Sequence, residues 1–268
     1  MIILFNSVTH HSGQSTSLYL LNRFASNLVG TDTSIVSMGE SSFYETAITT
    51  PYPGGHEDIQ TVLAKTPADG IKFLKSSMFS ISPKTRFYDA GFHDMKGEEK
   101  IFQATQFITR LGELTPNIYL DLGNQVNTFT SLGNLPAKIV IVTPPDLDMI
   151  RKTRKKVIEK VKRFKEETGD KFTTDIQYLI PRFNDQLSMR TIQNELECTA
   201  KELIIIRDLP QLYRARNQGR LDDLFDRIMV NPKASQGEAI FKSDIKTAAE
   251  KLMNRKFNNK AIYVLKEV

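Results

Sequence analysis

The sequence has 268 residues, 40% of them hydrophobic, so it can bury a substantial core, and we expect one domain over 1–268 with a C-terminal helix and tail over 238–268. A single cysteine, Cys198, excludes an internal disulfide and a cysteine-rich zinc site. The net charge of +5 permits contact with nucleic acid or an anionic membrane, and the lack of an apolar run of roughly 18 residues or a signal peptide predicts a cytoplasmic protein.

The first thirty residues predict a strand, a loop and a helix. Apolar residues over 2–5 indicate a buried strand, a polar loop follows over 6–13, and an apolar pattern at helical spacing covers 18–28. In a phosphate-binding loop of this layout, backbone N–H groups cradle phosphate oxygens, a lysine reaches the outer phosphates and a Ser/Thr hydroxyl holds magnesium. Gly13, Ser15 and Thr16 match this pattern, and Gln14 replaces the lysine. An ordinary strand-to-helix turn with a Ser/Thr cap is the alternative.

This segment resembles the deviant Walker A loop of the ParA/MinD superfamily, Lys-Gly-Gly-x-Gly-Lys-Ser/Thr-Thr. Thr9 takes the place of the signature lysine, and His10 and His11 take the places of two glycines. The resemblance implies ATP and Mg²⁺ as ligands, held by Gly13 to Thr16, and ATP-dependent dimers that position other machinery on DNA or membrane. Because both lysines are replaced, we expect weak nucleotide binding.

The next part of the chain alternates between strands and helices. Strands are predicted over 33–38 and 86–90, and a helix over 98–111. Residues 42–70 carry turn signals, which predicts a long loop ending in a short helix near 59–64. In the superfamily the second strand ends in aspartates that help to position magnesium and the attacking water, and here only Glu40 could replace them.

The next predicted strand lies within 117–124 and ends in an acidic residue and a glycine, in the sequence Asp121-Leu-Gly-Asn. A carboxylate at this end of a central strand suits a Walker B group that meets the magnesium shell. This stretch of sequence resembles the TadZ/CpaE branch of the superfamily. Asp121 and Glu40 are therefore the predicted catalytic residues, and Ser15 and Asp121 the predicted magnesium ligands. A plain turn residue at a strand end is the alternative for Asp121.

A strongly basic helix is predicted over about 146–167, after a strand over 137–143. Between positions 151 and 165 nine basic residues stand against one acid, Glu159, and an apolar stripe faces inward. A solvated helix face is one interpretation. The other is contact with DNA or an anionic membrane through Arg151, Lys155, Lys156, Lys162 and Arg163.

The last third predicts strands over 175–180 and 203–206, helices over 186–200, 211–220 and 238–256, and a short apolar tail over 261–265. In the superfamily an asparagine after the first of these strands contacts adenine, and Arg182 stands in that region here. The segment Pro210, Ala215 and Gly219 resembles the stretch that closes over the base. The resemblance thus places Arg182 and Pro210 beside a nucleotide.

The alternation of elements predicts an α/β fold with a doubly wound, mostly parallel sheet. Loss of one phosphate-stabilising charge typically costs about 10²- to 10³-fold in rate. Our hypothesis is a homodimeric localisation or assembly scaffold with slow or absent ATP hydrolysis, serving secretion, pilus or conjugation machinery at the inner membrane face or on the nucleoid. Two alternatives remain. One is an active partition ATPase that binds DNA for plasmid or chromosome segregation, and the other is an enzyme that uses the four histidines His10, His11, His56 and His93, with a metal bound at His10 and His11.

Overall fold

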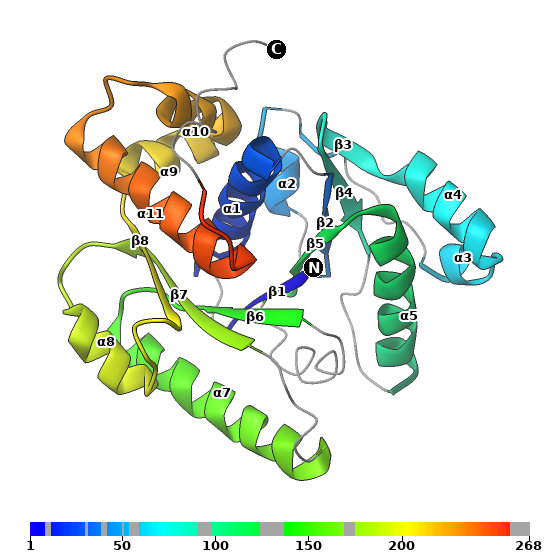
Figure 1. Ribbon diagram of the computed structural model, residues 1–268, viewed down its shortest axis with the longest axis horizontal. Helices are drawn as coiled ribbons and strands as arrows, with labels where there is room; N and C mark the ends of the chain where they lie inside the picture. Colours follow the sequence, from blue (N-terminus) through cyan, green and yellow to red (C-terminus); the bar gives the residue numbers. More distant parts are fainter. Residues whose placement is uncertain are drawn as a thin grey trace.

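One eight-stranded sheet forms the centre of the molecule (Figure 1). The computed structural model describes residues 1–8, 12–29, 32–38, 42–49, 51–53, 59–90, 98–123, 137–168 and 175–257. The strand order is β3-β4-β2-β5-β1-β6-β7-β8, and every neighbouring pair is parallel except β3 and β4. The predicted α/β, mostly parallel sheet is confirmed. The strands are β1 Ile2–Ser7, β2 Thr33–Ser37, β3 Phe79–Ser82, β4 Thr85–Asp89, β5 Asn117–Asp121, β6 Ala137–Val142, β7 Asp175–Phe183 and β8 Leu203–Arg207.

Helices cover both faces of the sheet (Figure 1). One face carries α1, α10 and α11, and the other carries α5, α7 and α8. Within the described parts of the chain, no helix combines the length and apolar character needed to cross a bilayer. The helices are α1 Gln14–Val29, α2 Ser42–Thr46, α3 Ile59–Leu63, α4 Pro67–Ser77, α5 Glu98–Leu114, α7 Leu147–Thr168, α8 Met189–Leu196, α9 Pro210–Asn217, α10 Leu221–Val230 and α11 Gln236–Met253.

Alternate residues of each central strand enter different hydrophobic cores. Ile3 and Phe5 of β1 join the core beneath α1 and α11, whereas Leu4 joins the core beneath α5 and α7. Strands buried on both faces consist of nearly continuous apolar runs. This explains why the sequence indicated the central strands clearly.

The first and last helices of the fold pack against each other. Phe24 of α1 and Ile245 of α11 belong to the same core, and the rings of Phe24 and Phe257 meet edge to face with centroids 6.0 Å apart. The apolar positions of α11 follow helical spacing at 241, 245, 248, 249 and 252. This contact completes the core on that face of the sheet.

Several short elements differ from the sequence prediction. The predicted loop over 42–70 contains α2 and the start of α4, while β3 and α10 were not predicted. The 5 residues of α2 and the 4 residues of β3 are too few to display a clear period. The helix predicted over 186–200 is shorter, because Glu197 adopts a left-handed conformation with φ of 51° that ends α8. The predicted tail over 261–265 lies outside the described residues, and the single-domain organisation stays a prediction.

Candidate functional site

The loop between β1 and α1 lies at the point where the winding of the sheet reverses. Strand β1 pairs in parallel with β5 on one side and β6 on the other. The chain leaves β1 for α1 on one face, and it leaves β6 for α7 on the opposite face. Such a reversal, at the carboxyl ends of parallel strands, is where α/β proteins bind their ligands.

Gly13 closes this loop in a conformation that suits glycine, with φ of +86°. The backbone N–H of Ser17 donates to the carbonyl oxygen of Gly13 at 2.9 Å, so the helical hydrogen-bonding pattern begins here. The predicted strand and helix are therefore present, as β1 and α1, and residues 9–11 of the predicted loop lie outside the described residues.

Gln14, the first residue of α1, turns its side chain inward. Its Nε2 donates to the carbonyl oxygen of Phe5 at 2.9 Å and to Oδ1 of Asp121 at 2.6 Å. The carbonyl oxygen of Phe5 can only accept, which fixes the amide orientation because the reverse would place oxygen against oxygen. Oε1 is buried and has no hydrogen-bond partner among the described residues. Gln14 thus joins β1 to β5 at the start of α1.

The carboxyl group of Asp121 is closed in by protein groups. The residue is 3% exposed, and its Oδ2 accepts a hydrogen bond from the Tyr44 hydroxyl at 3.1 Å. Its Oδ1 also accepts from the backbone N–H of Gly123 at 3.3 Å, and the Ser15 hydroxyl bonds to the same carboxyl group. Burial raises the pKa of Asp121 above its usual range, although these hydrogen bonds act in the opposite direction. The structure therefore brings together Ser15 and Asp121, the two predicted magnesium ligands.

Sequence reasoning missed Tyr44. The residue lies in α2, within the segment predicted as a loop, and it is fully buried with its ring 4.4 Å from that of Phe87, centroid to centroid. Burial raises the pKa of the Tyr44 hydroxyl, and the neighbouring Asp121 raises it further. A single tyrosine in a stretch without periodicity gave no signal of this contact.

A small cavity of about 70 Å³ lies outside the loop, between the start of α1, the ends of β7 and β8, and α9. Gly13, Thr16 and Arg182 contribute to its wall. Pro210 does not, because it is the exposed first residue of α9, and the neighbouring Leu209 takes its place in the wall. The predicted contacts of Gly13, Thr16, Arg182 and Pro210 with a nucleotide stay predictions.

Arg182 reaches the loop because its backbone takes a left-handed conformation with φ of 55°. A Cβ placed on Gly13 would lie 3.3 Å from Cγ of Pro181 and 3.9 Å from Nε of Arg182, so both residues pack directly against the loop. Arg216 of α9 lies in the same wall, over the ring of Phe43 at 5.5 Å. Burial lowers the pKa of Arg216, and the charge of Arg182 also lowers it. Two guanidinium groups near each other favour an anionic ligand.

The basic helix α7 uses part of its charge within the fold. Arg151 donates two hydrogen bonds to the Glu195 carboxylate of α8, at 3.0 and 2.9 Å, and Arg154 pairs with Glu197. Arg151 is thus a weaker candidate for an anionic partner than the sequence indicated. Lys155 and Lys156 are exposed, whereas the side chains of Lys162 and Arg163 lie outside the described part of the structure.

Several residues named in the sequence analysis fall outside the described residues. They are Thr9, His10, His11, Glu40, His56 and His93. The role of Glu40 and the metal site at the histidines therefore stay predictions. Among the residues that are described, no group of three or more His, Cys, Asp or Glu side chains is placed to hold a metal ion.

No protein-family model and no curated protein matches this sequence. Its fold, however, resembles that of several solved structures. MinD in the MinC:MinD cell division complex of Aquifex aeolicus superposes with a TM-score of 0.66 at 18% identity, covering 96% of this chain and 97% of that one. A ParA family ATPase from Chlorobium tepidum TLS gives a TM-score of 0.62 at 15% identity, covering 91% and 97%. The chain has the ParA/MinD ATPase fold.

A third structure with the ParA/MinD fold, the septum site-determining protein MinD of Pyrococcus horikoshii OT3, is a complex with Mg-ADP. It matches with a TM-score of 0.61 at 13% identity and covers 92% of this chain and 95% of that one. Whether Mg²⁺ or a nucleotide fits the present chain depends on the residues at its own loop.

The present arrangement does not fit a magnesium ion at Asp121. Such an ion is held by ionised carboxylate and other oxygen ligands. Both oxygens of Asp121 already accept hydrogen bonds, and burial favours the neutral carboxyl group. Gln14 or Tyr44 would have to turn away first. The 70 Å³ cavity is likewise smaller than the roughly 300 Å³ of typical ligand pockets.

The substitution Asp121→Asn is expected to stabilise this ParA/MinD-like fold at pH 7. Asparagine has nearly the same shape, and it removes the cost of ionising a buried carboxyl group. Because the folded-state pKa is raised above the ordinary value of 3.8, the folded protein binds this proton more tightly than the unfolded chain. The stability of the wild type should therefore fall, relative to the variant, as pH rises from about 4 through the folded-state pKa.

Urea unfolding of both proteins between about pH 3 and 8 measures this difference. We expect the variant to be the more stable protein at pH 7 and the gap to be smallest at about pH 3, where the carboxyl group is mostly protonated in both states. An advantage that is constant across the pH range would show that ionisation of Asp121 is not its cause.

Proposed function

We propose that this chain is a degenerate ParA/MinD-like protein with weak or absent ATP hydrolysis, and that it acts as a localisation or assembly scaffold. The observation that carries the proposal is the inward turn of Gln14, whose amide bonds to Phe5 and Asp121 at the position of the phosphate-binding lysine. A neutral amide committed to the sheet cannot stabilise charge that develops on a transferred phosphate. The expected cost of such a loss is about 10²- to 10³-fold in rate.

The surroundings of Asp121 support the same proposal. Hydrolysis in this fold depends on a Walker B carboxylate near magnesium. Here Tyr44 and Gln14 satisfy the carboxyl group, so the site is stable without a cation. Nucleotide that does bind would rely on backbone N–H groups at the start of α1, on the Ser15 and Thr16 hydroxyls and on the Arg182 guanidinium group.

The proposed homodimer would assemble without nucleotide. In the superfamily the signature lysine reaches the partner's phosphates, and Thr9 cannot do so. Nucleotide promotes dimerisation only if it binds the dimer more tightly than the monomer. Loss of this lysine therefore removes most of the coupling between nucleotide binding and dimerisation. We therefore propose a dimer whose stability does not depend on ATP. The machine that it serves, whether secretion, pilus or conjugation apparatus at the cytoplasmic side of the membrane, belongs to the same proposal.

Nucleotide binding and turnover of the purified protein test the function. We expect background ATP hydrolysis by the wild type, and about tenfold tighter binding of a fluorescent ATP analogue by Gln14→Lys, because a cation is restored near the phosphates. Sedimentation of the same samples with and without ATP and Mg²⁺ should give one unchanged dimer. Asn194→Lys is the matched control, because it adds the same charge at an exposed position of α8, away from the loop and its cavity.

Two results would contradict the proposal. One is wild-type turnover at the rate of an ordinary partition ATPase that Asp121→Ala abolishes. The other is a shift from monomer to dimer on adding ATP, since it would mean that the loop still works as a switch.

An active partition ATPase is the second candidate. The contact between Ser15 and Asp121 favours it, as does Arg182, whose guanidinium group lies beside Gly13 and could supply the missing lysine charge. The exposed Lys155 and Lys156 would then contribute to non-specific DNA binding. DNA affinity that falls steeply between about 50 and 200 mM salt, together with ATP turnover, would favour this candidate.

A further inference from the structure

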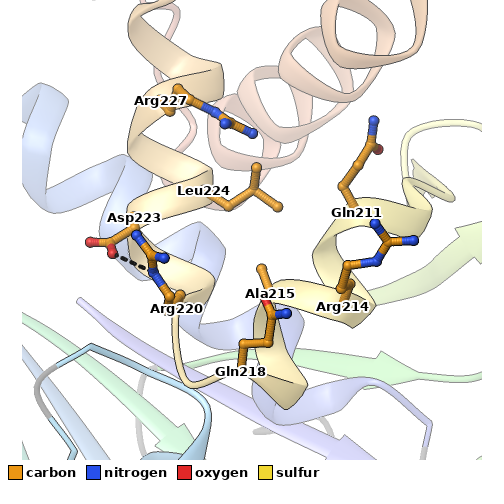
Figure 2. A pocket seen from close by; sticks show the side chains of 8 residues that line it. All are labelled: Gln211, Arg214, Ala215, Gln218, Arg220, Asp223, Leu224 and Arg227. Carbon is orange, nitrogen blue, oxygen red and sulfur yellow. Dashed lines mark hydrogen bonds and ion pairs between the residues drawn. The ribbon is translucent and has the colours of Figure 1, made fainter.

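A second cleft, of about 320 Å³, opens between α9 and α10 (Figure 2). Helix α9 separates it from the cavity at the nucleotide loop and contributes different residues to each. Leu212 and Arg216 face the loop cavity, whereas Gln211 and Arg214 face the cleft. The cleft is therefore a separate site, and a ligand could bind it without any nucleotide.

Three arginines border the cleft. Arg214 projects from α9, and Arg220 and Arg227 come from the start and the last turn of α10 (Figure 2). Arg220 pairs with Asp223 at 3.3 Å, and this is the one ion pair between the residues drawn. Arg214 and Arg227 lie toward different ends of the cleft.

The other carboxylates of helix α10 form contacts outside the cleft. Asp222 accepts hydrogen bonds from the backbone N–H and the hydroxyl of Thr49, at 2.8 and 2.6 Å. Asp226 pairs with Arg23 of α1. Glu238 lies near Arg227 but bonds to the backbone N–H of Ser235, where it caps α11. The cleft itself is thus lined by three guanidinium groups and one carboxylate.

The floor of the cleft is apolar. Ala215 and Leu224 are each 8% exposed and lie between the arginines, and the carboxamides of Gln211 and Gln218 stand beside them. Guanidinium groups form paired hydrogen bonds with carboxylates and phosphates. The apolar floor favours a ligand that carries a hydrophobic group between its anionic groups. Phosphates alone do not provide such a group. Carboxamides can bond to a peptide backbone.

We propose that this cleft binds an acidic segment of a partner protein, with carboxylates at Arg214 and Arg227 on either side of an apolar side chain that rests on Leu224. A nucleic acid backbone fits less well, because it offers charge without an apolar group. An α-helix with acids flanking a leucine would present these groups together. The cleft thereby gives the protein a recognition surface whose specificity comes from charge and its position.

Fluorescence anisotropy with three labelled peptides tests the chemistry. The first peptide carries glutamates on both sides of a leucine, the second has glutamines in place of the glutamates, and the third has serine in place of the leucine. At low salt we expect the first to bind at least tenfold more tightly than the second, and several-fold more tightly than the third. Equal binding of the first two peptides would overturn the proposal.

Substitutions on the protein locate the site. The triple variant Arg214→Gln, Arg220→Gln and Arg227→Gln is expected to lose at least tenfold in affinity for the first peptide, and Arg214→Gln or Arg227→Gln alone about threefold. The control triple Lys152→Gln, Lys155→Gln and Lys156→Gln removes the same charge from exposed positions of α7 and should bind as the wild type does. Equal losses in both triples would show general attraction of an acidic peptide by a basic protein and would overturn the site.

A DNA duplex is the competing ligand. If it binds more tightly than the first peptide, displaces it, and loses affinity in the arginine triple, the cleft is a phosphate site and the proposal is wrong. DNA binding that requires the α7 lysines and leaves the peptide bound would assign the duplex to α7 and so support the proposal. Thermal unfolding of each variant confirms that these exposed substitutions leave the fold intact.

Discussion

Replacing Gln14 with methionine is expected to lower the free energy of unfolding by about 2 to 3 kcal/mol. Methionine fills a similar volume but cannot donate. The carbonyl oxygen of Phe5 and Oδ1 of Asp121, which now accept at 2.9 and 2.6 Å, would each lose a buried partner. A buried acceptor left without a donor costs about 1 to 3 kcal/mol, and more when the acceptor is charged.

Urea unfolding measures the change, with Gln193→Met as the matched control. Gln193 is a half-buried residue of α8, where the same substitution removes no hydrogen bond to a buried carboxyl group. If Gln14→Met costs no more than the control, then the inward amide does not hold the two strands as described. The proposed scaffold function would then lose its main support, which is the hydrogen bonding of the Gln14 amide to Phe5 and Asp121.

Replacing Ile245 with alanine should cost about 2 to 5 kcal/mol of stability. Ile245 is 0% exposed and lies at the centre of the apolar stripe of α11, against the core that contains α1. The substitution removes three carbons from a close-packed interior and leaves a void that neighbouring residues fill only in part.

Ile240→Ala, on the same helix, is the control for this substitution. Ile240 is only half-buried, so the same change of residue removes less contact and should cost under about 1 kcal/mol. Thermal or urea unfolding of the two variants decides the matter. Similar losses in both would mean that α11 contributes through its helical propensity and not through its packing on α1.

The fold could be predicted from the sequence because its main elements have strong local signals. The central strands are apolar on both faces, and α5, α7 and α11 repeat apolar residues at helical spacing over three turns or more. The elements that were missed, such as α2 and α10, are short. Burial of α10 depends on α1 and α11, which are distant in the sequence.

The site could be predicted only in part. The order of Gly13, Ser15 and Asp121 indicated a phosphate loop facing a carboxylate, and the structure places these residues together. The direction of the Gln14 side chain could not be predicted, because it depends on an acceptor 107 residues away. Arg216 likewise enters the cavity wall through the placement of α9, for which no pattern in the sequence gave a direction.

The packing of α1 on α11 has a consequence for synthesis of the protein. The ribosome releases the N-terminus first, at about 5 to 20 residues per second. Helix α1 ends at Val29, whereas the helix that covers it ends at Met253. The apolar face of α1 therefore leaves the ribosome on the order of tens of seconds before its cover exists. During that interval the nascent chain presents this face to chaperones, and the earliest helix to be made is among the last to be enclosed.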